Sequence, residues 1–166
     1  MKAFSLARST ILSRFEASRA LSADYPTDTE FPIEAPNRRF QKPTSGPWGR
    51  ITVQFGERNQ ISIGGGAGSG NRKRTAFVLT LQIFVPEHKG EKEAFEIAEQ
   101  VMGSLDVQSI AAVDIPVTTR IDLFFGTVSF TPVGNVGGGE DEGAAGTAQF
   151  NATISGHFDD ILTSTP

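Results

Sequence analysis

The fold is decided by one stretch of the sequence, Thr75-Ala76-Phe77-Val78-Leu79-Thr80-Leu81-Gln82-Ile83-Phe84-Val85. Alternate positions from Phe77 to Val85 are all large and apolar, which is the two-residue period of a β-strand. The intervening positions are also partly apolar, because Val78 and Phe84 stand among them. A strand that is apolar on both faces is typical of the middle of a sheet. Pro86 follows it directly and predicts its end.

Two strands and an extended crossing segment are expected before this central strand. Residues 48–56 alternate apolar and polar side chains, and Ile61 with Ile63 predicts a second strand after a short turn. Residues 23–47 contain five prolines, which exclude a helix there. We therefore expect this segment to be extended, with at most a short edge strand near residues 31–35.

Two helices and three more strands complete the expected order. Residues 1–22 and 91–105 carry apolar side chains at helical spacing, as expected of helices that lie on a sheet. Three further strands are expected around the alternating segments 117–123, 128–130 and 148–154. The order helix, three strands, helix, three strands predicts an α+β fold of one domain. Its mixed or antiparallel sheet would carry both main helices on one face.

Two long loops and a tail interrupt this pattern. The first loop, residues 64–74, is rich in glycine and ends in a basic patch. The members of this patch are Arg72, Lys73 and Arg74. The second loop, residues 134–146, holds an acidic cluster, whose members are Glu140, Asp141 and Glu142. Residues 158–166 are expected to form a loose C-terminal strap.

Composition excludes several kinds of site. The chain has 166 residues, enough for one domain, and a net charge of −4, so it offers no broad basic surface for wrapping nucleic acid. It has no cysteine, which excludes disulfides, thiolate metal sites and cysteine nucleophiles. Its two histidines, His88 and His157, are too few for a histidine-rich metal site. We therefore expect no metal and no cofactor, and no run of apolar residues is long enough for a membrane helix.

The stretches that look most like catalytic motifs lack the residues that the chemistry needs. After the glycines of residues 64–70, a phosphate-binding loop would need Lys and then Ser or Thr, but Asn71 and Arg72 stand there. The loop also leads into a strand, whereas a phosphate site needs a helix N-terminus. Asp159 and Asp160 are adjacent, so on any strand they would point to opposite faces and could not share a cleft. We therefore expect no catalytic residue and no enzymatic activity.

The N-terminal helix allows two interpretations. Arg8, Arg14 and Arg19, several serines and a single acid together resemble a mitochondrial presequence. The other interpretation is an ordinary amphipathic helix docked on the sheet. The rest of the chain has to decide between them.

Four short segments and a helix carry a family resemblance. They are Pro47-Trp48-Gly49-Arg50-Ile51-Thr52-Val53-Gln54-Phe55-Gly56, Ile61-Ser62-Ile63-Gly64, Arg74-Thr75-Ala76-Phe77, Leu81-Gln82-Ile83-Phe84-Val85-Pro86 and the helix at 94–105. In this order they resemble the phage tail-terminator-like family of long-tailed bacteriophages, over residues 1–105. The resemblance also favours the docked helix, since a phage protein needs no mitochondrial address.

The resemblance implies a structural role in the virion. Members of the family form a ring, expected to be hexameric, at the head-proximal end of the tail tube, where the ring stops tube growth. The implied partners are other copies of this chain, the tail tube protein and the head–tail connector or head-completion protein, with no membrane. DNA is expected to pass through the lumen without sequence-specific binding. The implied location is the tail or neck of the virion, after assembly in the host cytoplasm.

A closed ring needs two different and complementary surfaces on each subunit. We therefore expect the basic patch of residues 72–74 or the acidic cluster of residues 140–142 to dock on a neighbouring subunit or on the tube. The alternative is that both are solvated hairpin tips. Two other functions stay open: a head-completion or connector adaptor of the phage neck, and an organellar enzyme or small-ligand-binding protein with a cleaved N-terminus.

Overall fold

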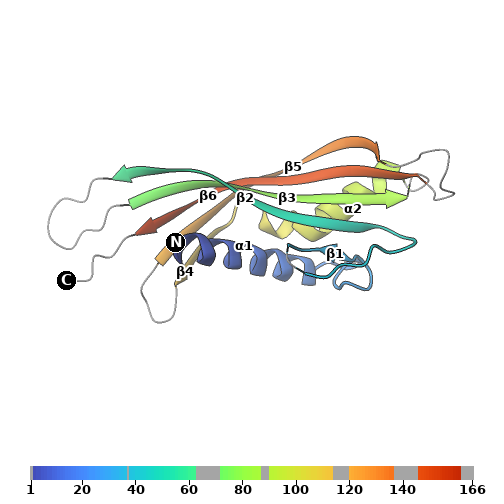
Figure 1. Cartoon of the computed structure of the whole chain (residues 1–166), viewed down its shortest axis with the longest axis horizontal. Coiled ribbons are helices and arrows are strands. Elements are labelled where there is room, and N and C mark those ends of the chain that lie inside the picture. The colour runs from blue at the N-terminus through green and yellow to red at the C-terminus, as the bar shows by residue number, and fades with distance from the viewer. Residues whose placement is uncertain are drawn as a thin grey trace.

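The chain forms one twisted sheet with two helices on the same face (Figure 1). The computed structural model describes residues 2–36, 38–62, 72–86, 90–113, 120–136 and 146–161. Along the chain the elements are α1 (Lys2–Ala20), β1 (Ile33–Glu34), β2 (Trp48–Ser62), β3 (Arg72–Pro86), α2 (Gly90–Met102), the 3-10 turn η1 (Gly103–Leu105), β4 (Ser109–Val113), β5 (Arg120–Val136) and β6 (Thr147–Ile161). The six strands lie in the order β1-β2-β3-β6-β5-β4. Strand β1 runs parallel to β2, and the other neighbouring pairs are antiparallel. The expected α+β class with a mixed sheet is confirmed.

The central position predicted for the strand at 75–85 is also confirmed. Strand β3 lies between β2 and β6, and its pairing with β6 runs without a register shift from Arg72 opposite Ile161 to Pro86 opposite Thr147. Alternate β3 side chains from Phe77 to Val85 are at most 1 % exposed. They form the middle of the core under the helices, which explains why this stretch is so apolar.

Both helices bury the faces that their sequences indicated. In α1, Ala3, Ala7, Ile11 and Phe15 are buried at spacings of four residues, which places them on one side of the helix. In α2 the buried side chains are Ala94, Ile97, Ala98, Val101 and Met102. The two helices are joined where the Ser18 hydroxyl donates a hydrogen bond to the Val101 carbonyl oxygen at 2.8 Å. In the described part of the chain, neither helix combines the length and apolarity needed to span a membrane.

The division into strands differs from the expected one, for a common physical reason. Strand β2 is continuous where two strands and a turn were predicted, and β5 likewise joins two predicted strands. Each contains a shift of register, between Phe55 and Arg58 in β2 and between Phe125 and Val128 in β5. Such a β-bulge moves the core-facing positions from odd to even residue numbers, so one strand looks like two in the sequence. Strand β4 was not predicted.

The expected loops are shorter than the sequence indicated. Strand β3 begins at Arg72, so the basic patch belongs to a strand and not to the loop at 64–74. Strand β5 extends to Val136, and β6 extends to Ile161. The expected C-terminal strap is therefore wrong for residues 158–161, where Phe158 is fully buried in the core. The remainder of the loops and of the tail lies outside the described residues.

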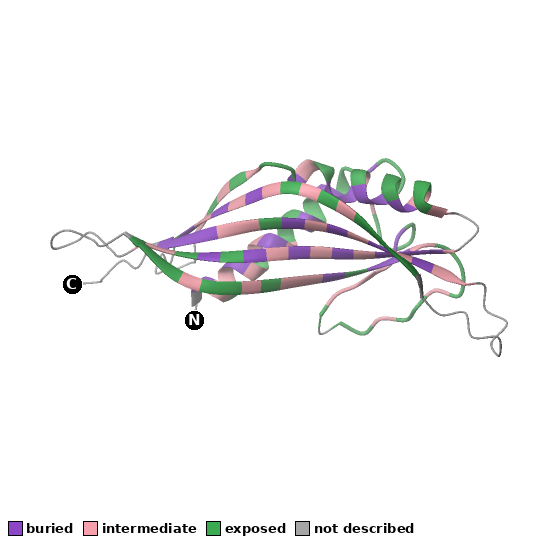
Figure 2. Cartoon of the chain, turned by 90° about the horizontal axis from the view of Figure 1, so that it is seen from above, coloured by how far each residue is buried: buried purple, intermediate pink, exposed green. Residues whose placement is uncertain are grey.

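Neither of the described helices lies on the second face of the sheet (Figure 1). Figure 2 views this face, along which exposed and half-buried residues alternate with buried ones on the four long strands. Its outward side chains are largely uncharged and polar, including Thr52, Thr80, Gln82, Asn151 and Thr153. The helices therefore shield one side of the sheet, and the other side stays available for contact.

Candidate assembly surfaces

The basic patch lies at one end of the sheet, where it is paired with acids. This charged end comprises Arg58, Arg72, Arg74, Asp122, Asp159 and Asp160. Arg74 donates hydrogen bonds from Nε to Asp159 Oδ1 at 2.7 Å and from Nη2 to Asp159 Oδ2 at 2.9 Å. Arg72 donates from Nη2 to Asp122 Oδ2 at 3.0 Å, and its Nε lies 3.7 Å from Asp159 Oδ2. Two of the three predicted interface cations are therefore engaged within their own subunit. For Lys73, the third, the described residues contain no ion pair.

The ion pairs at the charged end shift the pKa values of Asp159, Arg74 and His157. The hydrogen bonds from Arg74 hold the pKa of Asp159 below its ordinary value, and Asp159 in turn raises the pKa of Arg74. His157 stacks on Phe124 with ring centroids 4.7 Å apart. Burial lowers the pKa of His157, and the nearby Arg74 cation lowers it further. Both shifts favour an ionised Asp159 and a neutral His157 near pH 7, as expected where Arg74 and Asp159 form an ion pair.

Asp160 belongs to a separate pair on the helix-covered face. Its carboxylate accepts from Arg58 Nη2, and the guanidinium of Arg58 lies 5.8 Å from the ring centroid of Phe4 in α1. Asp160 is 1 % exposed. Asp159 and Asp160 therefore point to opposite faces, as predicted from their adjacency, and they do not converge on one cleft.

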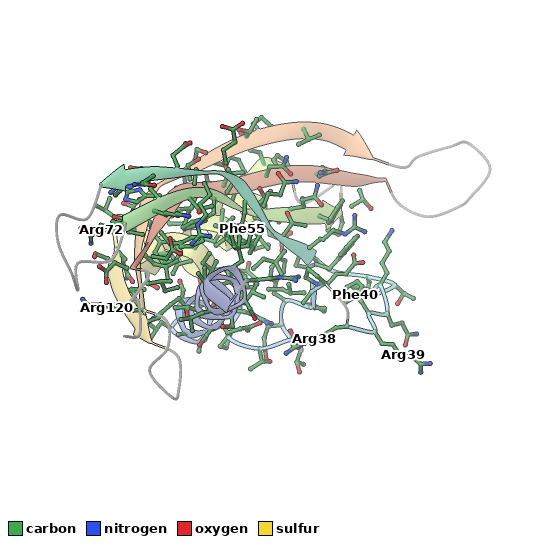
Figure 3. All side chains as sticks on the ribbon, turned by 60° about the vertical axis from the view of Figure 1, so that its left-hand side comes forward. Arg38, Arg39, Phe40, Phe55, Arg72 and Arg120 are labelled. Carbon is green, nitrogen blue, oxygen red and sulfur yellow. The ribbon has the colours of Figure 1, made fainter. Side chains whose placement is uncertain are left out.

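A second basic feature lies at the other end of the molecule and was missed in the sequence. This basic segment, residues 38–42, presents three exposed cations, Arg38, Arg39 and Lys42. No described acidic side chain forms an ion pair with any of the three. Figure 3 places Arg38 and Arg39 at one end of the molecule and Arg72 and Arg120 at the other, with Arg39 pointing away from the body. The sequence could have indicated this segment, because residues 35–47 contain three cations and no acid to pair with them.

An aromatic cluster anchors the basic segment to the sheet. The Trp48 and Phe84 rings stack with centroids 4.0 Å apart, and Phe40 packs on Trp48 at 5.5 Å. The ammonium of Lys42 lies 5.6 Å from the Trp48 ring centroid, in a cation–π contact. These contacts position the backbone of the segment while its two arginine side chains remain in solvent.

An acidic, aromatic groove lies between α2 and β5. This α2–β5 groove has a volume of about 240 Å³ and is lined by Phe95, Ala98, Glu99, Gly103, Asp106, Thr127, Val128 and Phe130. Phe95 is 50 % exposed and meets Phe130 edge to face, with ring centroids 5.3 Å apart. Glu99 and Asp106 are both exposed and supply the negative charge. The groove was also missed in the sequence, because the pairing of α2 with β5 is a tertiary contact.

A second groove lies between α1 and β4. It has a volume of about 420 Å³ and is lined mainly by small side chains, namely those of Ser9, Thr10, Ser13, Ala17, Ala111 and Ala112, together with Arg14 and Ile110. Among the described residues, no three His, Cys, Asp or Glu side chains gather in a way that could hold a metal ion. The acidic cluster Glu140, Asp141 and Glu142 lies outside the described residues.

Comparison with known proteins shows the family of the chain. No curated protein matches it. Five solved chains match it. One of them, whose title states no function, is 17 % identical and aligns over 97 % of each chain with a TM-score of 0.52. This likeness shows that the two chains share a fold. The model of a family described as "Phage tail terminator protein" matches residues 14–120, more than half of the sequence. The chain therefore belongs to the phage tail terminator family and is a structural protein of the bacteriophage tail.

Proposed function

We propose that six copies of this chain form a closed ring at the head-proximal end of the tail tube. The ring ends tube growth and offers a surface for head attachment, while DNA passes through its lumen without sequence-specific binding. The family match carries the proposal, because residues 14–120 span α2, the strands β1 to β4 and the C-terminal part of α1. Its partners are accordingly other copies of the chain, the tube protein and the connector or head-completion protein.

The shape of the subunit supports a ring. The two edges of the sheet differ, since β1 and the basic segment lie beside β2, whereas β4 and the α2–β5 groove lie beside β5. Unlike edges suit a head-to-tail interface, which generates a ring when the rotation closes. The helix-free face adds a broad surface of amide and hydroxyl side chains that can hydrogen-bond to a protein partner.

The charged end contributes to the proposal through Lys73. Reversing the charge of Arg72 or Arg74 would break ion pairs with Asp122 and Asp159, so such variants would test folding as well as assembly. Lys73→Glu avoids this difficulty. If this end contacts a neighbour or the tube, Lys73→Glu weakens ring or tail binding, whereas unchanged binding would exclude the contact.

Electron microscopy of tails made without the protein tests the function. Tails longer than those of the wild type are expected, because nothing stops the tube. Tails of normal length that fail to join heads would instead indicate a neck adaptor. Normal tails joined to heads would overturn the proposal altogether. Native mass spectrometry of the protein, free and bound to tails, gives the number of subunits in the ring.

A further inference from the structure

The α2–β5 groove has the chemistry of an arginine-binding site. Its apolar side presents the rings of Phe95 and Phe130, and its rim carries the carboxylates of Glu99 and Asp106. A guanidinium plane packs on an aromatic ring and at the same time forms paired hydrogen bonds to a carboxylate. The aliphatic stem of an arginine covers apolar surface that would otherwise face water.

The acids of the groove are placed to receive such a group. Asp106 Oδ1 accepts a hydrogen bond from the Val128 backbone N–H at 3.0 Å, which holds its carboxylate beside the bulge of β5. Glu99 makes no ion pair with any described residue. Glu91 and Phe95 stand eight and four residues before Glu99 on α2, so the three side chains lie along one stripe of the helix. Along this stripe the aromatic ring of Phe95 therefore lies between two carboxylates, those of Glu91 and Glu99.

The groove also exposes apolar surface beside a strained backbone. Phe95 is 50 % exposed and Val107, next to Asp106, is 72 % exposed. Val107 has a φ of 50°, in the left-handed region that a β-branched residue rarely adopts. Strained conformations of this kind gather at functional sites, where the surrounding structure holds them in place. Here the turn is held by hydrogen bonds from Val107 N to Gly126 O and from Phe125 N to Gln108 O.

We propose that this groove takes Arg38 and Arg39 from a second copy of the chain. The two surfaces are complementary, since one presents exposed cations that pair with no described acid and the other presents carboxylates beside aromatic rings. They lie apart within one subunit, because the basic segment packs on Trp48 of β2 and the groove lies beside β5, with β3 and β6 between these two strands. The contact is therefore head to tail. It rests on the proposed function, for which it supplies the joint between neighbouring subunits.

Engineered disulfides test the contact directly, because the chain has no cysteine of its own. A chain with Arg39→Cys and Glu99→Cys, oxidised while bound to purified tails, is expected to form covalent dimers and a ladder of larger multimers. The matched control is Arg39→Cys with Glu57→Cys, which replaces another exposed glutamate, on β2, with β3 and β6 lying between it and β5. Absence of the ladder, or an equal ladder from the control, would overturn the proposal.

A charge exchange gives an independent readout in the intact chain. Arg38→Glu with Arg39→Glu is expected to abolish multimers, and so is Glu91→Arg with Glu99→Arg. All four changes in one chain restore the complementarity and should restore multimers. Tail length separates the two proposals: if deletion of the protein lengthens tails but the exchanged chains assemble like the wild type, only the contact is wrong. If deletion leaves tails unchanged, the proposed function itself fails.

Discussion

Arg74 and Asp159 face each other across β3 and β6 and share two hydrogen bonds, of 2.7 and 2.9 Å. Asp159 is 1 % exposed, whereas the Arg74 side chain is 45 % exposed. The pair therefore joins an almost buried carboxylate to a cation that still reaches water. Arg74, which the sequence presented as part of a basic patch for a partner, therefore stabilises its own subunit.

Asp159→Asn should destabilise the subunit. It removes the charged acceptor of Arg74 and the 3.7 Å contact with Arg72, but Arg74 can turn toward water. A loss of about 1–2 kcal/mol in the free energy of unfolding is expected, below the cost of breaking a fully buried pair. Urea denaturation measures it. Glu34→Gln is the control, because both members of its pair with Arg50 reach solvent, at 33 % and 45 % exposure, and the pair should contribute less than about 1 kcal/mol. Equal losses in the two variants would contradict this account.

The stabilisation from Asp159 should disappear in acid. Its pKa is lower in the folded state than in the unfolded chain, so its contribution is complete above the unfolded value, about pH 4, and is lost as the pH falls through the folded value. In a His157→Gln background, which removes the coupling of Asp159 to this ring, the loss of unfolding free energy caused by Asp159→Asn should be constant from about pH 5 to 7 and shrink below about pH 4. Urea denaturation at several pH values measures this, and a difference that grows in acid would contradict it.

His157 should titrate below the ordinary value for histidine. Burial and the Arg74 cation both disfavour its charged form, while Asp159 opposes them, so its pKa is lowered. Because the unfolded chain binds this proton more readily, His157 lowers stability as the pH falls from the unfolded pKa, about 6.5, toward the folded value. NMR titration of the His157 ring measures the folded pKa, with His157→Gln to assign the signal. A pKa above about 6.5 would contradict the arrangement.

Gly156→Ala should disrupt the sheet. A methyl group at Gly156 would meet the Phe124 carbonyl oxygen of β5 and would lie 2.5 Å from the Phe77 ring. Because backbone cannot move aside easily, a loss of about 1–3 kcal/mol or more is expected. Gly56→Ala is the control, since there the nearest atom is the Ala76 methyl at 3.6 Å, an ordinary contact. Thermal unfolding compares the two, and similar midpoints would show that the strands can separate to make room.

Val107→Asn should stabilise the isolated subunit. Asn tolerates the left-handed backbone at φ 50°, so the change should add up to about 1 kcal/mol, or about 2–4 °C in Tm. Val133→Asn is the control: Val133 is 51 % exposed without a positive φ, so it offers no strain to relieve. A lower Tm for Val107→Asn would show that the valine side chain stabilises the turn in the free subunit.

Much of the fold was readable from the sequence because it rests on local periodicity. The pattern of residues 75–85 predicted a central strand, and the spacing of Ala7, Ile11 and Phe15 predicted a helix with one buried face; both are confirmed. The strand boundaries were wrong at the bulges of β2 and β5. A bulge is decided by the partner strand, which a local pattern does not reveal.

For the candidate surfaces, too, the sequence determined some features and the tertiary structure decided the others. The sequence by itself determined which residues are charged and that no cysteine chemistry is possible. Only the tertiary structure decided which charges are left for partners: Arg72 and Arg74 meet Asp122 and Asp159, which lie 50 and 85 positions further along the chain, while Arg38 and Arg39 meet no described acid. The physical reason is that an ion pair depends on distance in space, and strand pairing creates that proximity independently of separation along the chain.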